Sequence, residues 1–221
     1  MLEAINIIKS YDTGGAAAQV LRNVSLTVEE GEFVSVVGRS GSGKTTLLSV
    51  LSSLTRADSG IVRFNGNIID HARERDLNRL RQSEFAIIFQ FHHLMPYMTA
   101  LENVLLPSMH GITPVNGQDR ANALAALERV GLAGKEHKLP GALSGGEQQR
   151  VAIARALARK ASVLFADEPT GSLDAATGDS IINLISDLHK DGLTVVMVTH
   201  NPEYAAAASR TVTMHDGQIV S

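Results

Sequence analysis

The sequence predicts an α/β fold with a mainly parallel sheet, an antiparallel β region near the N-terminus and a helical subdomain inserted into the middle of the chain. Three observations lead to this prediction. Strand-like segments fill the first third, a helical period dominates from residue 91 to about residue 158, and strands alternate with helices after that. Since parallel strands need long crossover connections, which are usually helices, this alternation predicts a parallel sheet.

The first third of the chain predicts a strand, a glycine-rich loop and a helix in direct succession. Segment 32–37 is β-branched, a Gly-rich turn follows it, and apolar residues then recur at helical spacing. A later hairpin turns at Asn65-Gly66. In chain order, we predict strands over 2–8, 26–28 and 32–37, a helix over 47–54, a hairpin over 58–70, a helix over about 74–82 and a strand over 85–89.

The middle of the chain predicts two strong helices, over 119–130 and 144–160, and the last third returns to strand, helix and strand. The chain ends in a hairpin that turns at Asp216-Gly217. On the first helix, we expect one inward face made of Ala121, Leu124, Ala125, Leu127 and Val130. The remaining elements are strands over 162–166 and 193–198, a helix that carries Ile181, Ile182, Ile185 and Leu188, and a hairpin over 211–220.

The composition is that of a folded domain without disulfides. The 221 residues are 44% hydrophobic and 19% charged, which excludes a disordered chain. There is no cysteine, so a disulfide scaffold, a thiol nucleophile and a zinc–thiolate site are excluded. A net charge of −3 gives no basic field, and we expect no nucleic-acid partner. The apolar runs are strand-length and the N-terminus has no basic segment, so we expect neither a membrane span nor a targeting segment.

The loop over residues 38–45 carries the clearest chemical signal. Its sequence, GRSGSGKT, matches G-x-x-x-x-G-K-[ST] and lies between a predicted strand and a predicted helix. Glycines at 38, 41 and 43 let backbone N–H groups approach a polyphosphate, and the N-terminus of the following helix attracts anions. Lys44 is then expected to reach the β- and γ-phosphates, and the Thr45 hydroxyl to ligate Mg²⁺.

Two carboxylates follow the predicted strand over 162–166. Ligands of open α/β sheets bind at the carboxyl ends of strands, so Asp167 and Glu168 are expected at such a site. We expect Asp167 to hold the Mg²⁺ shell and Glu168 to polarise the attacking water. A helix cap or a solvated acidic turn is the structural alternative, and the loop over 38–45 in the same chain weighs against it.

A third motif opens the helix over 144–160. Ser144 and Glu147 fit S-x-x-E, which predicts a capping box. Capping does not explain the consecutive glycines Gly145 and Gly146, because glycine destabilises a helix interior. Bare N–H groups at a helix N-terminus form an anion site, so the chain is expected to carry a second phosphate-binding surface.

With these motifs, the chain resembles the ATP-binding subunit of an ATP-binding cassette (ABC) transporter over essentially all of its length. Residues 38–45 resemble the Walker A loop, and residues 163–168 resemble the Walker B strand with its catalytic Glu. Residues 143–147 resemble the signature motif, although many members have Gln where this chain has Glu147. The resemblance also covers Gln90, the dimer-interface loop over 172–174, the switch histidine His200 and Tyr11, which matches the aromatic that stacks on adenine.

The resemblance implies a single ABC ATPase domain over 1–221, with ATP and Mg²⁺ as ligands. A RecA-like core with the antiparallel β region would occupy 1–90 and 159–221, and the helical signature subdomain 91–158. The implied catalytic residues are Glu168, His200 and Lys44, and the implied metal-site residues are Thr45, Gln90 and Asp167. The implied nucleotide-binding residues are Tyr11, Gly38, Arg39, Ser40, Gly41, Ser42, Gly43, Lys44, Thr45, Thr46, Gln90, Ser144, Gly145, Gly146, Glu147 and Asp174.

A finer resemblance points to bacterial exporters of the lipoprotein-releasing and macrolide-efflux type, and haem exporters share it. It rests on segments 90–104 and 166–171, while Arg39 and Ser172 depart from the residues common there, Pro and Asn. It implies an ATP-bound homodimer in which each nucleotide lies between one Walker A loop and the partner's signature motif. It also implies a separate transmembrane permease subunit and a peripheral location on the cytoplasmic side of the inner membrane. Exposed apolar residues in the 91–115 segment are expected to dock on that subunit.

Several alternatives stay open at this stage. His200 also fits a surface turn, Tyr11 a cap on the sheet and Gln90 a polar strand end. For the whole chain, a regulatory cassette of the cell-division type, which moves no cargo, remains possible. A nucleotide kinase would have no use for segment 143–147, and a DNA-repair cassette needs a long coiled-coil insertion that 221 residues cannot hold.

Overall fold

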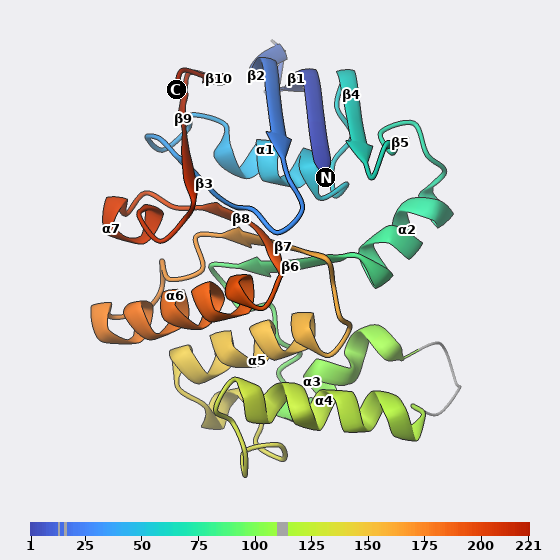
Figure 1. The fold of residues 1–221 in the computed structure, drawn as a ribbon, viewed down its shortest axis with the longest axis vertical. Helices are drawn as coiled ribbons and strands as arrows, with labels where there is room; N and C mark the ends of the chain where they lie inside the picture. Colours follow the sequence, from blue (N-terminus) through green and yellow to red (C-terminus); the bar gives the residue numbers. More distant parts are fainter. Residues whose placement is uncertain (13, 16, 110–114) are drawn as a thin grey trace.

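The chain folds into two β-sheets and a set of helices stacked along its longest axis (Figure 1). The structure is a computed structural model, and it describes residues 1–12, 14–15, 17–109 and 115–221. Its strands are β1 (Leu2–Asp12), β2 (Ala17–Val28), β3 (Phe33–Val37), β4 (Ser59–Phe64), β5 (Asn67–Ile68), β6 (Phe85–Phe89), β7 (Val163–Asp167), β8 (Thr194–Val198), β9 (Arg210–His215) and β10 (Gln218–Ile219). Its α-helices are α1 (Lys44–Leu51), α2 (Glu74–Ser83), α3 (Ala100–Leu105), α4 (Gly117–Arg129), α5 (Gly145–Leu157), α6 (Ala175–Lys190) and α7 (Pro202–Ala205).

The larger sheet has the strand order β10-β9-β3-β8-β7-β6. All of its neighbouring pairs are parallel except β10–β9. Every residue of β8 is buried, as expected for a parallel strand covered on both faces. The smaller sheet has the order β2-β1-β4-β5 and is antiparallel throughout. The predicted fold class, an α/β core with an N-terminal antiparallel region, is confirmed.

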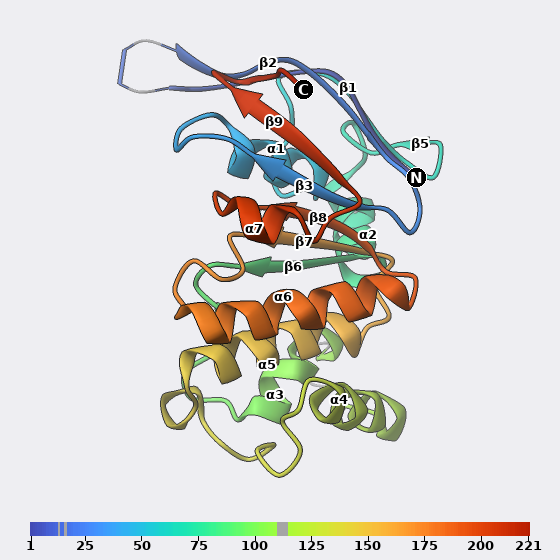
Figure 2. The same cartoon turned by 60° about the vertical axis from the view of Figure 1, so that its left-hand side comes forward.

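Helices cover both faces of the larger sheet. α1 lies between the two sheets and buries Leu47, Leu48 and Leu51 there (Figure 1). α6 and α5 cover the opposite face, and α3 and α4 lie beyond them (Figure 2). Because α1 directly follows β3, the loop between them is held at the carboxyl edge of the sheet.

The inward face predicted for the helix over 119–130 is correct for Leu127 and Val130, which are buried, and wrong for its other three residues. α4 buries Ala123, Ala126 and Leu127 against its neighbours, whereas Ala121, Leu124 and Ala125 are exposed. Both sets have the helical i, i+3, i+4 spacing, because apolar residues lie almost all around this helix. Packing against α3 and α5 therefore selects the face, and the sequence period does not. The division of the chain at 91–158 remains a prediction.

The second strand is also much longer than predicted. β2 starts at Ala17, not at residue 26, and pairs antiparallel with β1 along its length. It lies at the edge of its sheet, and most of its first half is exposed. Its N-terminal half, AAQVLR, places the apolar residues Val20 and Leu21 next to each other, so it lacks the regular alternation that signals a half-buried strand.

Candidate active site

A cavity of about 450 Å³ lies where four neighbouring parallel strands end. The predicted phosphate loop follows β3, Gln90 follows β6, Glu168 follows β7, and His200 lies shortly after β8. The carboxyl ends of parallel strands meet at one edge of the sheet, where ligands of such folds bind. The cavity is lined by Val20, Ser40, Gly41, Gly43, Lys44, Thr45, Thr46, Gln90, Glu168 and His200.

The phosphate loop wraps around the N-terminus of α1 as the sequence predicts. Gly43 precedes the first helical residue with φ +98°, a left-handed conformation that favours glycine. A Cβ atom there would come within 2.9 Å of the carbonyl oxygen of Val20, so β2 also requires a glycine at this position. The loop is therefore shaped by its own backbone and by the adjacent strand.

Lys44 is buried inside this loop, with 8% of its surface exposed. Its Nζ donates hydrogen bonds to the carbonyl oxygens of Gly38 at 2.9 Å and Arg39 at 3.0 Å. An ammonium group has three N–H donors, so one is left for a phosphate oxygen. The buried hydroxyl of Ser42 has no hydrogen-bond partner among the described residues. Both groups fit a loop that folds around an anion.

Asp167 and Thr45 bring two oxygen atoms together beside the loop. The Thr45 hydroxyl donates to Oδ1 of Asp167 at 3.1 Å. Burial, together with the negative charge of Glu168, raises the pKa of the Asp167 carboxyl above its ordinary value. Mg²⁺ prefers oxygen ligands, and a site with one carboxylate and one hydroxyl leaves room for water and phosphate oxygens. Among the described residues, no group of three or more His, Asp and Glu side chains is arranged to hold a metal ion by itself.

Glu168 and His200 contact each other at the other end of the cavity. The Nδ1 atom of His200 lies 2.7 Å from Oε2 of Glu168. Glu168 has φ +49°, which is strained for a residue with a side chain, and its backbone N–H donates to the carbonyl of Val198 at 3.0 Å. The neighbouring strand therefore holds a strained residue in place, a pattern that is frequent at functional sites.

Gln90 is held by the segment that follows Glu168. The Ser172 hydroxyl donates to the backbone carbonyl of Gln90 at 3.0 Å. A Cβ atom on Gly171 would come within 2.9 Å of the Gln90 side-chain amide, so the glycine leaves room for that side chain. Gln90 therefore contacts the segment over 171–174 through both its backbone and its side chain.

The signature segment and Asp174 lie outside this cavity and form a second surface. Ser144 and Glu147 make the predicted capping box at the start of α5, and Asp174 caps α6 by accepting from Thr177 N–H at 3.0 Å. A Cβ atom on Gly146 would come within 2.3 Å of Cγ2 of Thr177. Close packing of α5 on α6 thus explains one of the two consecutive glycines, and this reason was missing from the sequence analysis. Ser144, Gly145 and Asp174 remain exposed.

Val20 is the cavity residue that the sequence analysis missed. It comes from β2, whose N-terminal half gives no signal in the sequence. Tyr11, the residue predicted to stack on adenine, is not among the described residues that line the cavity. It lies on β1 with 41% of its surface exposed, and the Nζ atom of Lys9 is 5.4 Å from its ring centre. Its proposed contact with a base remains a prediction.

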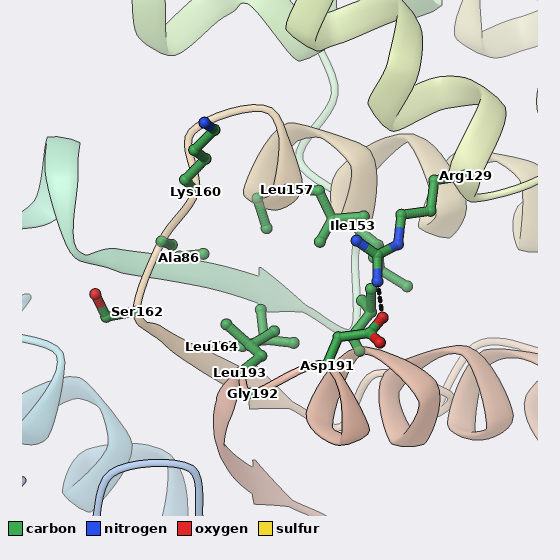
Figure 3. A pocket seen from close by; sticks show the side chains of 13 residues that line it. Ala86, Arg129, Ile153, Leu157, Lys160, Ser162, Leu164, Asp191, Gly192 and Leu193 are labelled. Atoms are coloured by element: carbon green, nitrogen blue, oxygen red, sulfur yellow. Dashed lines mark hydrogen bonds and ion pairs between the residues drawn. The ribbon is translucent and has the colours of Figure 1, made fainter.

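A second cavity, of about 280 Å³, lies at the opposite ends of the strands (Figure 3). Leu164 of β7 and Ile153 of α5 contribute to its apolar wall, and an ion pair between Arg129 and Asp191 spans one side. It contains none of the predicted site residues. No helix in the described part of the chain has the length and apolar character needed to cross a membrane.

Comparison with known proteins identifies the family to which the chain is similar. A family model described as ABC transporter matches residues 21–171. The chain is 44% identical over 226 residues to the lipoprotein-releasing system ATP-binding protein LolD of Geobacter metallireducens, and the match covers 100% of this chain and 98% of that protein. It is 43% identical over 222 residues to the macrolide export ATP-binding/permease protein MacB of Neisseria meningitidis, and that match covers 100% of this chain and 34% of MacB. The chain therefore spans about a third of the length of its MacB relatives.

Solved structures of two ATP-binding cassettes have a similar fold. The ATP-binding cassette MJ0796, in a dimeric post-hydrolysis state bound to ADP and Pi, superposes with a TM-score of 0.91 at 38% identity, over 100% of this chain and 97% of that chain. The cbiO1 subunit of the cbiONQ transporter from Clostridium perfringens superposes with a TM-score of 0.86 at 26% identity, over 100% and 86% of the two chains.

Proposed function

The chain belongs to the ABC transporter family, and from this premise we propose that it binds and hydrolyses ATP to drive a separate membrane subunit. The observation that carries the proposal is the cavity in which the phosphate loop, Gln90, Glu168 and His200 meet. Each comes from a different strand end, so the fold has to be complete for the site to exist. Such a constellation is suited to positioning a phosphate chain and a water molecule.

In this proposal, the phosphate loop binds the nucleotide through backbone N–H groups and Lys44, and Tyr11 stacks on the base. Thr45, Asp167 and Gln90 would hold Mg²⁺, which would supply positive charge against the phosphate oxygens. Glu168 accepts a proton from the attacking water. His200, which contacts Glu168, holds that carboxylate and faces the γ-phosphate.

Two copies of the chain would complete two sites. Ser144, Gly145, Gly146 and Glu147 lie at the start of α5, outside the phosphate-loop cavity, and Ser144 and Gly145 are exposed there. A second copy would bring the N–H groups of Gly145 and Gly146 to the γ-phosphate bound by the first, because those of Ser144 and Glu147 are already used in the capping box. Asp174 would lie at the interface. The dimeric state of the MJ0796 cassette supports this arrangement for this chain.

The name and length of one relative support the proposed membrane partner and location. The match covers nearly the full length of LolD, which is named as the ATP-binding protein of a lipoprotein-releasing system. We therefore propose a separate transmembrane permease subunit, with this chain bound peripherally on the cytoplasmic side of the inner membrane. The cargo class is a hydrophobic molecule, either a lipoprotein or a small amphipathic compound.

A mixing experiment tests whether the sites are shared. Differently tagged Ser144→Arg and Lys44→Ala chains are co-purified as heterodimers with MgATP. If each site combines one phosphate loop with the partner's α5, this heterodimer has one intact site and regains ATPase activity over both homodimers.

The matched control carries the same two substitutions in one chain, paired with wild type. In the shared arrangement this heterodimer has no intact site, whereas with sites inside one chain it has one. Activity in the control and none in the first heterodimer would therefore refute the shared site.

A further inference from the structure

Glu147 places a negative charge at the start of α5. Its Oε2 atom accepts a hydrogen bond from the backbone N–H of Ser144 at 2.8 Å, and its Oε1 atom is paired with Nζ of Lys135. The hydrogen bond from Lys135, together with the Ser144 N–H group, lowers the pKa of the Glu147 carboxyl below its ordinary value. The residue is therefore ionised at neutral pH.

This charge has opposite effects on the helix and on a bound anion. A carboxylate in the first turn stabilises a helix, because the helix N-terminus carries partial positive charge. The same positive end is the surface proposed to receive the γ-phosphate of the partner's ATP. An uncompensated carboxylate there would repel that phosphate, and a Gln at this position would not.

Lys135 is held in a position to cancel this charge. It lies in the connection between α4 and α5, and this connection is tied to α3 just after Lys135. Its neighbours Glu136 and Lys138 accept backbone hydrogen bonds at 3.0 Å from Leu101 and 2.8 Å from Ala100. The Lys135 and Glu147 side chains are 35% and 24% exposed, so solvent screens the pair only in part.

We propose that Lys135 is a positioning residue that neutralises Glu147 and so allows the start of α5 to accept the γ-phosphate held by a second copy of the chain. The proposal rests on the shared-site function above and deepens it. It gives the signature segment over 143–147 a second component, Lys135, which lies 8 to 12 positions earlier in the chain and outside the motif of consecutive residues.

The test is a double-mutant cycle on the ATP-bound dimer. Glu168→Gln serves as the parent, because slow hydrolysis lets the dimer accumulate. Sedimentation with MgATP gives the dimer dissociation constant for the parent, Lys135→Met, Glu147→Gln and the double variant. Lys135→Met removes a partly exposed ion pair at each of the two shared sites. We therefore expect it to raise the dimer dissociation constant roughly threefold to tenfold.

Three further results are expected. Glu147→Gln does not weaken the dimer. In the Glu147→Gln background, Lys135→Met changes the dimer dissociation constant less than about twofold. Lys135→Arg, which keeps the positive charge, has the dissociation constant of the parent. Lys138→Met is the matched control. Lys138 acts on Glu147 through charge alone, so its loss has a smaller effect than the loss of Lys135. ATP binding by the monomer stays at the parent level in Lys135→Met, since Lys135 lies outside the phosphate-loop cavity.

The remaining outcomes overturn the proposal. If Lys135→Met has no effect, or the same effect in both backgrounds, Lys135 does not act through Glu147. If Glu147→Gln weakens the dimer as much as Lys135→Met, the pair only stabilises the fold of α5. If the Glu168→Gln parent itself stays monomeric with MgATP, the shared-site function fails first and the proposal falls with it.

Discussion

The Nδ1 atom of His200 lies 2.7 Å from Oε2 of Glu168, although 32 positions separate the two residues in the sequence. The contact crosses from the end of β8 to the end of β7, two neighbouring parallel strands. It links the residue proposed to accept a proton from water with the residue proposed to face the γ-phosphate. The Glu168 side chain is 19% exposed and His200 is 70% exposed, so His200 lies on the solvent side of the pair.

Loss of this contact should slow hydrolysis without loss of ATP binding. His200→Ala removes one hydrogen bond to a carboxylate, which is typically equivalent to about 1.5–3 kcal/mol, or roughly tenfold to a hundredfold in rate. Turnover and nucleotide affinity are measured side by side. His71→Ala is the control, because His71 is an exposed histidine that pairs with Asp70, away from the cavity. Equal turnover in the two variants would remove His200 from the mechanism.

Asp167→Asn should weaken nucleotide binding and also stabilise the nucleotide-free chain. The pKa of Asp167 is raised in the folded state, mainly by burial, so the folded state binds a proton more readily than the unfolded state. Stability therefore falls as pH rises from the ordinary Asp value to the raised one, and the ionised group remains destabilising at neutral pH. Asn removes that charge, so the melting temperature should rise while affinity for MgATP falls. The control is Asp187→Asn, at an exposed position of α6. A lower melting temperature of Asp167→Asn at pH 7 would show that burial of the charge does not destabilise the chain.

Gly146→Ala should disturb the contact between α5 and α6. The new Cβ would lie 2.3 Å from Cγ2 of Thr177, and overpacking of this kind typically costs about 1–3 kcal/mol. Thr177→Ser removes Cγ2 but keeps the hydroxyl that donates to Asp174 at 2.6 Å. Thermal unfolding should show a loss for Gly146→Ala that Thr177→Ser largely restores. If the double variant is as unstable as the single one, this contact is not the reason for the glycine.

Tyr97→Asp should abolish co-purification with a membrane subunit while ATP binding is retained. Of the apolar residues expected to be exposed in the 91–115 segment, Tyr97 is 92% exposed and Met95 is 46% exposed, whereas Leu105 is buried. An exposed aromatic side chain in the segment that follows Gln90 suits a docking groove for a helix of the partner. Ile68→Asp, another exposed apolar position, should leave the complex intact. Recovery of the complex with Tyr97→Asp at normal yield would place the docking surface elsewhere.

The sequence predicted the parts of this molecule that depend on local chemistry. Gly43 and Lys44 signal the phosphate loop through their types and order, and the capping box at Ser144 follows from a three-residue spacing. Buried strands such as β7 and β8 are continuous apolar runs, so their ends, and the site residues that follow them, could be located in advance.

The features that were missed depend on contacts between distant segments. Val20 reaches the cavity from an exposed edge strand, and Thr177 requires glycine at 146 from another helix. Neither leaves a local pattern in the sequence. The inward face of α4 was partly wrong for the same reason, because the neighbouring helices select between two equally spaced faces.

The proposal that Glu168 is the general base is tested by the rate at which Glu168→Gln hydrolyses ATP. Gln has nearly the same shape as Glu but cannot accept a proton, and a positioned general base typically contributes about 10²–10⁴-fold in rate. We expect the rate of single-turnover hydrolysis to fall by that factor while ATP binding is retained. MgATP should then convert the variant from monomer to dimer on size-exclusion chromatography. Glu203→Gln on α7 should hydrolyse ATP like wild type. Near-normal turnover in Glu168→Gln would contradict the account, since no other carboxylate among the described residues lines the cavity.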